Sequence, residues 1–578
     1  MRGIAKVASR FRQLAVWCLI LCANLAFAGP RKVSEDLQKL PSGNLVNVIV
    51  RYQAPPNRAD FARVLARGGS LHSSFRIINA AAITVKAGSL AALARDPNVV
   101  YVSPDRTVSA TATITDYYDQ AVLAPYAWSE GLNGSGIGVA VIDSGISSHK
   151  DFSLSGGSGS RIVYSQSFVL GQKSTDDKYG HGTHVAGILA GNGTDSKGKN
   201  YRKTFMGVAG SANLINLRVL DQNGNGTDSG VIAAIQKAIS LKNTYNIRVI
   251  NLSLGRPVYE SSKLDPLCQA VEAAWKAGIV VVVAAGNEGR NDSAHTDGYG
   301  TITVPGNDPF VITVGAMKPM GTATRADDLI ASYSSKGPTL LDHTVKPDIV
   351  APGNDVISAM ASSSATLIRE YPQNIVTLSS YSTSKSGSSN YFTLSGTSMA
   401  APVVSGAAAL LLQKNSSLTP DQVKARLMKS AYKTFPRSST ATDPNTGKTY
   451  TDQYDIFTVG AGYLDIQEAL ENTDLAPATV GSAKSPTAVL QHGTVYLEDG
   501  PSEIWNTSAT WGASVVWGTS VIESTNAKAE SILWGSTSEC WGSDDDQGFS
   551  VVWGTSVVWG TSDQNANEAI EIAIDGEK

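Results

Sequence analysis

Five apolar runs between residues 136 and 317 constrain the fold of this 578-residue chain most strongly. The runs are GIGVAVID (136–143), LINLRVL (214–220), RVINLSL (248–254), IVVVVAA (279–285) and VITVGAM (311–317). Strands that are covered on both faces of a sheet have such near-continuous apolar sequences. Helical patterns at 228–241 and 265–277 separate three of the runs, which predicts parallel strands joined by helical crossovers. We therefore expect an α/β domain with a mainly parallel sheet.

A smaller unit at 44–108 precedes this α/β region, which occupies residues 112–475. In the smaller unit NLVNVIVRY alternates as a strand, and RADFARVLARGG is typical of a helix that ends at two glycines. A strand near 83–85, a short helix at 89–94 and the strand NVVYVSPD follow. Two helices interleaved with strands predict a small α+β sandwich of ferredoxin type.

Local sequence patterns predict three further features of the α/β region, namely a helix start, a loop and a buried cysteine. Thr419-Pro420 places a cap residue before proline, which predicts the start of a helix. The Ser/Thr-rich stretch 361–390 is predicted to be a long surface loop. Cys268 lies in a helical pattern and is expected to be a buried, apolar side chain rather than a disulfide partner.

The first 28 residues have the pattern of a secretory signal peptide. Basic residues from Arg2 to Arg12 precede a mostly apolar run, Leu14 to Ala23, and Ala26-Phe27-Ala28 forms an A-x-A cleavage site. The run is too short to span a bilayer comfortably, and no later apolar run reaches about 18 residues. We expect an exported protein, extracellular, periplasmic or cell-surface associated, with no membrane span after signal removal. The net charge of −3 gives no electrostatic reason to expect a nucleic-acid partner.

The segment 476–578 is rich in tryptophan. Seven of the ten tryptophans lie between 505 and 559, mostly in variants of V-V-W-G-T-S. Trp505, Trp511 and Trp517 are six apart, as are Trp553 and Trp559, and Trp541 is twice six before Trp553, so an even period places these tryptophans on one face of an extended chain. This pattern fits a stacking or adhesive surface. It also fits a low-complexity segment that packs against its own repeats, stays disordered or is removed, and we favour this second interpretation because composition names no ligand. The acidic stretch 563–578 is predicted to be frayed.

Three short motifs place polar residues where α/β sheets bind ligands. The first contains Asp143, which ends an apolar run before Ser144-Gly145 and so lies at the carboxyl edge of the predicted sheet. An aspartate at such a position is also a common turn residue. Asp143 alone therefore does not identify a site.

The second motif is G-H-G-T-H-V-A-G at 180–187. His181 stands at or just before a helix start, whereas His184 lies in the helix body. A zinc site needs three or four ligands, and paired histidines on a helix are more usually four apart with a glutamate between them. The sequence offers no obvious third ligand, so a metal site is disfavoured. We expect His184 to make a structural hydrogen bond.

The third motif is T-L-S-G-T-S-M-A-A-P at 393–402. Small residues before Ser398 permit a tight turn, and the apolar run after it predicts a buried helix. A serine at a helix start exposes its Oγ atom, and its own backbone N–H can bind a developing oxyanion. A simple helix cap would explain Ser398 alone.

Together and in this order, the three motifs resemble those of the subtilisin-like serine protease family. V-A-V-I-D-S-G-I matches the family's aspartate motif, H-G-T-H-V-A-G its histidine motif and G-T-S-M-A-A-P its serine motif. The resemblance implies a three-layer α/β fold and a serine endopeptidase that needs no cofactor for its chemistry. It implies that Ser398 is the nucleophile, His181 the general base and Asp143 the residue that orients the imidazole.

The resemblance also implies an oxyanion hole and a substrate cleft. Asn287 in VVVAAGNEG matches the family's oxyanion donor, beside the backbone of Ser398. The substrate-binding positions that match are Gly224, Asn225 and Gly226, which pair with an extended substrate, Ser253, Leu254 and Gly255 on the opposite wall, and Ala284, Ala285 and Gly286 in the primary pocket. Such small, uncharged walls suit bulky apolar side chains. Thr303, however, stands where the family often has glycine at the pocket floor, which leaves the pocket depth open.

A structural calcium ion is compatible with the resemblance, but no metal-binding residue set can be named. Asp151 matches one frequent family ligand, while the loop after the histidine helix lacks the usual calcium pattern. D-Q-N-G-N-G at 221–226 resembles half of an EF-hand loop, but Ile232 occupies the position of the essential glutamate. An EF-hand is therefore rejected.

Residues 29–111, with a core at 44–108, resemble the family's inhibitory propeptide. The resemblance implies a zymogen that removes this segment itself, with a cut between 110 and 113. The expected partners are protein or peptide substrates and the protein's own propeptide. Two alternatives are a catalytically inert scaffold whose tail binds a surface, and an esterase or other acyl transferase. The complete triad argues against the first, and the strand-pairing segment and propeptide favour peptide substrates over the second.

Overall fold

The computed structural model describes residues 32–38, 40–109, 117–154, 159–292, 295–384, 386–443, 446–491 and 494–498, together with Val516 and Gly576–Glu577. The predicted signal peptide, the predicted cut at 110–113 and the tryptophan spacing lie outside the described residues. Among the described residues no helix is long and apolar enough to cross a membrane.

The central sheet has eight strands in the order β13-β12-β11-β10-β6-β8-β7, with β14 beside β12. The strands are β6 (Gly138–Asp143), β7 (Ile162–Ser167), β8 (Asn213–Arg218), β10 (Ile247–Leu252), β11 (Val280–Ala284), β12 (Ile312–Lys318), β13 (Leu329–Ile330) and β14 (Ile349–Pro352). All neighbouring pairs are parallel except β12 with β13. The five apolar runs form β6, β8, β10, β11 and β12, so the predicted mainly parallel α/β sheet is confirmed.

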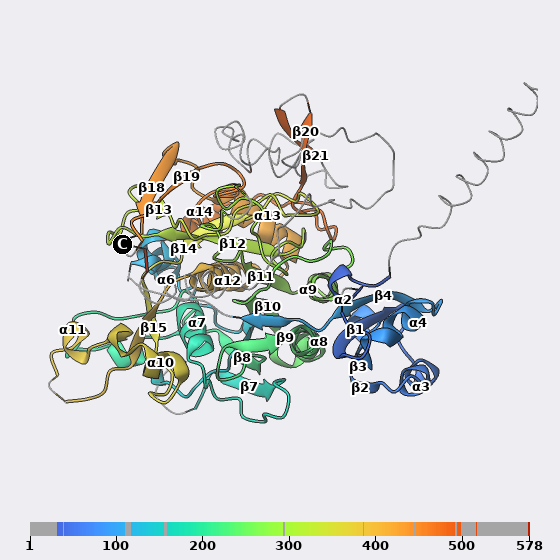
Figure 1. Cartoon of the computed structure of the whole chain (residues 1–578). Helices are drawn as coiled ribbons and strands as arrows, with labels where there is room; N and C mark the ends of the chain where they lie inside the picture. The colour runs from blue at the N-terminus through green and yellow to red at the C-terminus, as the bar shows by residue number, and fades with distance from the viewer. Residues whose placement is uncertain are drawn as a thin grey trace, which may run out of the picture.

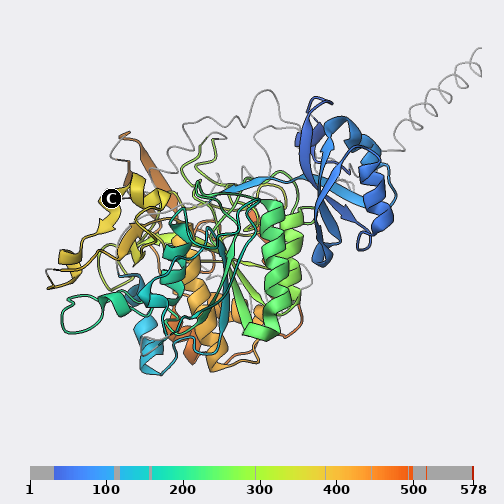
Figure 2. The same cartoon turned by 90° about the horizontal axis from the view of Figure 1, so that it is seen from below.

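Helices cover both faces of this sheet and make three layers (Figures 1 and 2). Helices α8 (Asp228–Tyr245) and α9 (Pro266–Lys276) pack together on one face. On the other face α12 (Thr397–Lys414) packs against α7 (His181–Ala190) and against strands β10, β11 and β12. The three-layer fold that the family resemblance implies is therefore present.

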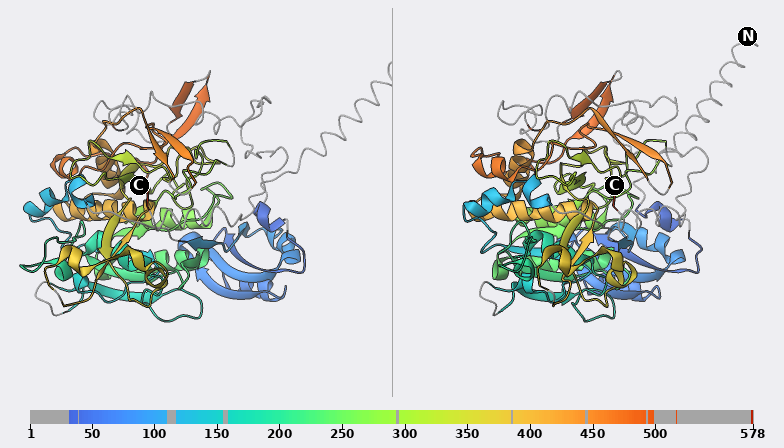
Figure 3. Two further views of the ribbon diagram at one scale, coloured as in Figure 1. Left: turned by 60° about the vertical axis from the view of Figure 1, so that its left-hand side comes forward. Right: turned by 90° about the vertical axis from the view of Figure 1, so that its left-hand side faces the viewer.

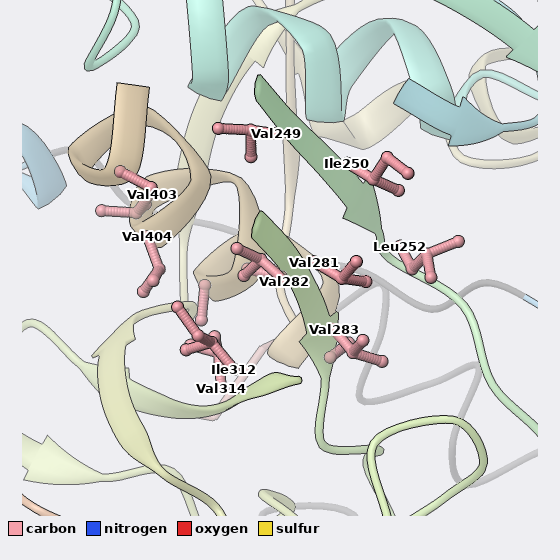
Figure 4. Packing of buried hydrophobic residues seen from close by; sticks show 14 of the residues in the cluster. Val249, Ile250, Leu252, Val281, Val282, Val283, Ile312, Val314, Val403 and Val404 are labelled. Atoms are coloured by element: carbon pink, nitrogen blue, oxygen red, sulfur yellow. The ribbon is translucent and has the colours of Figure 1, made fainter. Parts of the chain in front are cut away.

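Side chains of the central strands alternate between the two helical layers. Val249 and Val282 point toward α12, whereas Ile250 and Val281 point toward the opposite face (Figure 4). All four are buried. Because both faces are covered, both parities of each strand are apolar, and this produces the continuous runs in the sequence.

The N-terminal unit is a four-stranded antiparallel sheet in the order β2-β3-β1-β4. Its elements are β1 (Leu45–Tyr52), α3 (Arg58–Leu65), β2 (Ser70–Phe75), β3 (Ala80–Lys86), α4 (Leu90–Ala94) and β4 (Val99–Pro104). A capping box between Asn57 and Asp60 starts α3. This arrangement is the predicted α+β sandwich. The unit lies at the side of the larger domain, against α8 and α9 (Figures 2 and 3).

The prediction of a long surface loop at 361–390 is partly wrong. This stretch contains helices α10 (Thr366–Glu370) and α11 (Leu378–Tyr381) and strand β16 (Ile375–Val376). Strand β16 joins a small sheet with β15 (Val356–Ala359) and β17 (Tyr391–Leu394). Tyr381 packs with Phe205 and Tyr391 in a separate apolar cluster. A few buried apolar side chains therefore order a stretch whose composition is mostly polar.

The described residues also form further helices and strands. They are α2 (Glu35–Gln38), β5 (Thr107–Ser109), α5 (Tyr118–Ala121), α6 (Ala124–Ser129), β9 (Asn225–Thr227), α13 (Pro420–Ser430), β18 (Ser438–Thr442), β19 (Thr449–Gln453), α14 (Ile466–Glu471), β20 (Thr487–Gln491) and β21 (Thr494–Glu498). Thr419 caps α13 as predicted. Cys268 is buried and unbridged, also as predicted. The prediction of a frayed acidic end is wrong at Glu577, which is buried.

Candidate active site

Asp143 and His181 meet at the carboxyl edge of the sheet. Asp143 is the last residue of β6, and His181 is the first residue of α7. The Nδ1 atom of His181 lies 2.8 Å from Asp143 Oδ1, and both side chains are buried. The backbone N–H of Ser144 donates to the same carboxylate oxygen over 2.7 Å. A carboxylate in this place fixes the ring so that Nδ1 carries the proton and Nε2 faces away from Asp143.

The close approach of α7 to Asp143 depends on a glycine and a buried aspartate. A Cβ atom on Gly182 would lie 2.3 Å from the carbonyl oxygen of Gly145, so no other residue fits there without a shift. Asp177 accepts hydrogen bonds from the N–H groups of Gly180 and Thr183, at 2.7 and 2.8 Å, and so caps the helix. Sequence reasoning missed Asp177, because it lies four residues before His181 and not at the cap position itself, which is Gly180.

His184 plays a different part from His181. Its Nε2 atom lies 3.1 Å from the carbonyl oxygen of Val356 and 3.0 Å from that of Phe392, on strands β15 and β17. Burial lowers the pKa of His184 to about 3, so the ring is neutral at ordinary pH. His184 thus makes the expected structural hydrogen bond and ties α7 to the small sheet.

Ser398 is the second residue of α12, which begins directly after a tight turn. The turn residue Gly396 has a φ of 128°, which favours glycine. Ser398 Oγ donates to the carbonyl oxygen of Ser253 over 3.2 Å, and Ser253 Oγ donates back to the Ser398 carbonyl oxygen over 2.7 Å. These reciprocal bonds join the start of α12 to the end of β10.

Asn287 is oriented by the residue that precedes Ser398. Its Oδ1 atom accepts hydrogen bonds from the backbone N–H and the hydroxyl of Thr397, at 2.9 and 3.0 Å. The Thr397 hydroxyl is itself 3.1 Å from the backbone N–H of Gly286. With Oδ1 engaged in this way, the donor end of the amide, Nδ2, is turned away from Thr397.

The predicted strand-pairing segment is paired within the chain itself. Strand β5 of the N-terminal segment runs antiparallel to β9, with Val108 opposite Gly226 and Ser109 opposite Asn225. The edge at Asn225–Thr227 therefore accepts an extended peptide as an added strand. Gly224 precedes it with a φ of 77°.

The loops after β10 and β11 face each other across Thr303. A Cβ atom on Gly255 would lie 2.6 Å from Thr303 Oγ1, and one on Gly286 would lie 2.7 Å from Thr303 Cγ2. Thr303 Oγ1 also donates to the carbonyl oxygen of Ala285 over 3.2 Å. Leu254, Ala284 and Ala285 are buried. The threonine side chain thus occupies the space between the two glycine walls.

A second set of contacts joins the N-terminal unit to the larger domain. The guanidinium of Arg106 donates to both carboxylate oxygens of Glu260, each over 2.7 Å, and both side chains are buried. The carboxylate of Asp105 accepts from the backbone N–H of Ser229 over 2.6 Å, at the start of α8. Sequence reasoning missed these pairs because their partners are far apart in the chain.

Only one cluster of the described residues gathers potential metal ligands, namely His149, Asp151 and Asp195. The carboxylate of Asp151 already accepts from the N–H of Asp195 over 2.8 Å and from the hydroxyl of Tyr391 over 2.7 Å. Both ring nitrogens of His149 are bonded to backbone groups. The ammonium of Lys150 lies 2.8 Å from Asp195. Protein donors and a fixed positive charge take up this cluster, so it does not fit a calcium ion.

Comparison with known proteins identifies the family of this chain. The model of the subtilase family, Peptidase_S8, matches residues 134–462. Serine protease AprX of Bacillus subtilis is 36% identical over 407 residues, which cover 67% of this chain and 83% of that protein. Subtilisin E of the same organism is 36% identical over 367 residues, 63% of this chain and 78% of its own.

Among solved structures, fervidolysin from Fervidobacterium pennivorans, a keratinolytic enzyme related to subtilisin, has the same fold. Its TM-score is 0.57 at 22% sequence identity, over 80% of this chain and 68% of that chain. The family match covers more than half of the present sequence and includes all three motif regions. The chain therefore belongs to the subtilase family and is a subtilisin-like serine endopeptidase.

Proposed function

We propose that this subtilase is a secreted zymogen that cleaves peptide bonds through Asp143, His181 and Ser398. The buried contact between Asp143 Oδ1 and His181 Nδ1, at 2.8 Å, is the observation that carries the proposal. It leaves Nε2 of His181 as the proton acceptor, on a helix that packs against the helix of Ser398.

The reaction follows from these positions. Ser398 Oγ attacks the substrate carbonyl carbon and gives its proton to Nε2 of His181. Asp143 keeps the Nδ1 proton in place and stabilises the imidazolium ion. His181 then passes its proton to the leaving amine as the C–N bond breaks. Water hydrolyses the acyl-enzyme ester by the same steps and regenerates Ser398. No metal or organic cofactor takes part in this scheme.

The oxyanion is bound by two donors, the backbone N–H of Ser398 and the side-chain Nδ2 of Asn287. The position of Oδ1 against Thr397 supports this assignment, because it fixes which end of the amide can donate. Such donors act on charge that develops only in the transition state.

The N-terminal unit, residues 29–111, acts as an inhibitory propeptide. Its last described strand, β5, pairs with strand β9, the edge with which a substrate backbone would pair. The buried contact of Arg106 with Glu260 and the half-buried contact of Asp105 with Ser229 hold the unit beside this edge. The proposed cut between residues 110 and 113 follows β5 directly, as expected for a chain that enters its own cleft.

Protein substrates with small side chains before the scissile bond fit the cleft best. Gly224, Asn225 and Gly226 would pair with the substrate backbone, and Ser253, Leu254 and Gly255 would form the opposite wall. The primary pocket of Ala284, Ala285 and Gly286 is filled in part by Thr303. The bulky apolar residues expected from the pocket walls alone would collide with that side chain. We therefore replace that expectation with alanine, serine or threonine.

The domain limits follow the same scheme. Residues 1–28 are the signal peptide, 112–475 the catalytic domain and 476–578 the repeat-bearing tail. We expect the mature protein outside the cytoplasm, either extracellular, periplasmic or at the cell surface.

Purified wild-type protein and its Ser398→Ala variant test the proposal. Wild type should shed the residues before about 112, cleave casein and be labelled at Ser398 by an arylsulfonyl fluoride. The variant should keep the N-terminal unit, cut nothing and stay unlabelled, whereas a Ser416→Ala control, changed at an exposed serine just after the same helix, should behave as wild type. Processing and casein cleavage by Ser398→Ala would refute the proposed nucleophile.

A further inference from the structure

A polar pocket of the catalytic domain holds the dipeptide Gly576–Glu577. The backbone N–H of Ser332 donates to Glu577 Oε2 over 2.8 Å, and Arg290 donates to the same oxygen over 3.2 Å. The ammonium of Lys318 lies 3.8 Å from the other carboxylate oxygen. Glu577 is only 4% exposed, so its charge is removed from water and matched by built-in donors.

The pocket also forms hydrogen bonds with the backbone of this segment. The side-chain amide of Asn354 accepts from the N–H of Glu577 over 3.0 Å and donates to its carbonyl oxygen over 3.1 Å. Asn354 is fully buried and bonded to Ser395. A two-way amide clamp of this kind selects a backbone in one orientation and fixes the position of the side chain it presents.

The backbone conformation before the glutamate favours glycine. Gly576 has a φ of 66°, and a Cβ atom there would lie 2.7 Å from a carboxylate oxygen of Asp355. The backbone shape and the positive charges of the pocket thus suit a glycine followed by a glutamate.

A second contact of the same tail is independent of this pocket. Val516, in a V-V-W-G-T-S repeat, is buried, and its carbonyl oxygen accepts from the ammonium of Lys433 over 2.7 Å. Lys433 also donates to the carbonyl oxygens of Met428 and Ala461. Among the described residues of the tail beyond β21, both Val516 and Gly576–Glu577 therefore contact the catalytic domain.

The Gly-Glu pocket adjoins the segments that carry the proposed oxyanion donor and nucleophile. Arg290 follows Asn287 by three residues and donates to Ser332 Oγ over 2.7 Å. On the other side Ser395, three residues before Ser398, donates to Asn354 over 3.2 Å. Glu577 thus bridges the outer sides of these two segments.

We propose that the pocket of Arg290, Lys318, Ser332 and Asn354 is an intramolecular docking site for Gly576–Glu577. It fastens the far end of the tail to the catalytic domain, and it braces the loop that carries Asn287. The occupant is this chain's own segment, and docking does not require proteolytic activity.

Hydrogen exchange at the Ser332 amide tests the proposal, because that N–H donates to Glu577. The parent is the full chain with Ser398→Ala, which prevents self-cleavage. Glu577→Ala and Gly576→Ala should each speed exchange at Ser332 by roughly tenfold or more. Glu571→Ala, which removes an equal charge from the same acidic stretch, should leave it unchanged. Exchange at Val282 in the core strand β11 should stay constant in all variants and so report intact folding.

Asn354→Ala provides the second arm. It should also speed exchange at Ser332, because loss of the backbone clamp releases the dipeptide. In a Glu577→Ala background it should add little, since the segment is already undocked. Three results would each overturn the proposal. They are unchanged Ser332 exchange in Glu577→Ala, an effect of Glu571→Ala equal to that of Glu577→Ala, and fully additive effects of Asn354→Ala and Glu577→Ala.

Discussion

The Oδ1 atom of Asn287 accepts a hydrogen bond from the backbone N–H of Thr397 over 2.9 Å, which couples the loop after β11 to the residue before Ser398. This bond turns the amide so that its donor group can face a substrate carbonyl at Ser398. The orientation of Asn287 is therefore set by the same turn that presents the proposed nucleophile.

Replacing Asn287 should lower turnover far more than substrate affinity. Asn287→Ala should reduce kcat by about 10² to 10³, the size known for loss of an oxyanion donor in subtilisin-type enzymes. KM should change little, because the donor acts on transition-state charge. Asn287→Asp keeps an acceptor for Thr397 but loses the donor, so it should be similarly impaired. Steady-state kinetics on a peptide substrate decide the matter, and wild-type turnover in Asn287→Asp would contradict the role.

Thr303 should set the size of the side chain accepted before the scissile bond. Thr303→Gly should raise kcat/KM for substrates with phenylalanine or leucine there, relative to alanine, by roughly 10- to 200-fold, because a cavity opens between Gly255 and Gly286. Thr303→Ser, which keeps the hydroxyl bonded to Ala285, should shift the ratio less. A peptide library gives the profile. A wild-type preference for phenylalanine would show that Thr303 does not limit the pocket.

The buried pair of Arg106 and Glu260 should control how long the cleaved N-terminal unit stays bound. Arg106→Met leaves the Glu260 carboxylate buried without its partner, at a cost of about 3–5 kcal/mol. The processed variant should release its N-terminal unit during size-exclusion chromatography, under conditions where the wild-type pieces elute together. Arg95→Met, at an exposed arginine of the same unit, is the matched control. Co-elution of the Arg106→Met pieces would argue against this contact as an anchor.

His184 should make folding stability fall on acidification. Burial lowers its pKa to about 3 from 6.5, so the unfolded chain binds a proton below pH 6.5 that the folded chain refuses until about pH 3. Stability is therefore lost as the pH falls through that window, by about 2 kcal/mol at pH 5.

His184→Gln removes this titration while it can still donate a hydrogen bond to a strand carbonyl. Urea unfolding at pH 7 and pH 5, in the Ser398→Ala background, should show a smaller pH dependence in the variant by about 2 kcal/mol. In the active enzyme the variant should retain most proteolytic activity. An identical pH dependence with and without His184 would contradict the assignment.

The central sheet and the contact between Asp143 and His181 could be anticipated because their signals are local. A strand covered on both faces is apolar at both parities, and each motif joins one polar residue to a turn or a helix start. Gly182 is an example. The sequence shows a glycine there, and its lack of a side chain lets α7 approach Asp143.

Contacts between distant segments could not be anticipated in this way. Arg106 and Glu260 are 154 residues apart, and neither stands in a distinctive local pattern. Glu577 belongs to a stretch whose acidic composition predicts fraying, and only the tertiary pocket shows why it is held. Likewise, Tyr381 orders a Ser/Thr-rich stretch through a distant aromatic partner, Phe205.

Because the tail is held at both ends, its attachment determines how many proteolytic cuts are needed to release it. Beyond β21 the chain is held again at Gly576–Glu577, so one cut between residues 499 and 575 leaves both fragments attached to the enzyme. Shedding the tail takes either two cuts or one cut plus undocking. A single cut in the tail by a neighbouring copy of the enzyme would then release no fragment.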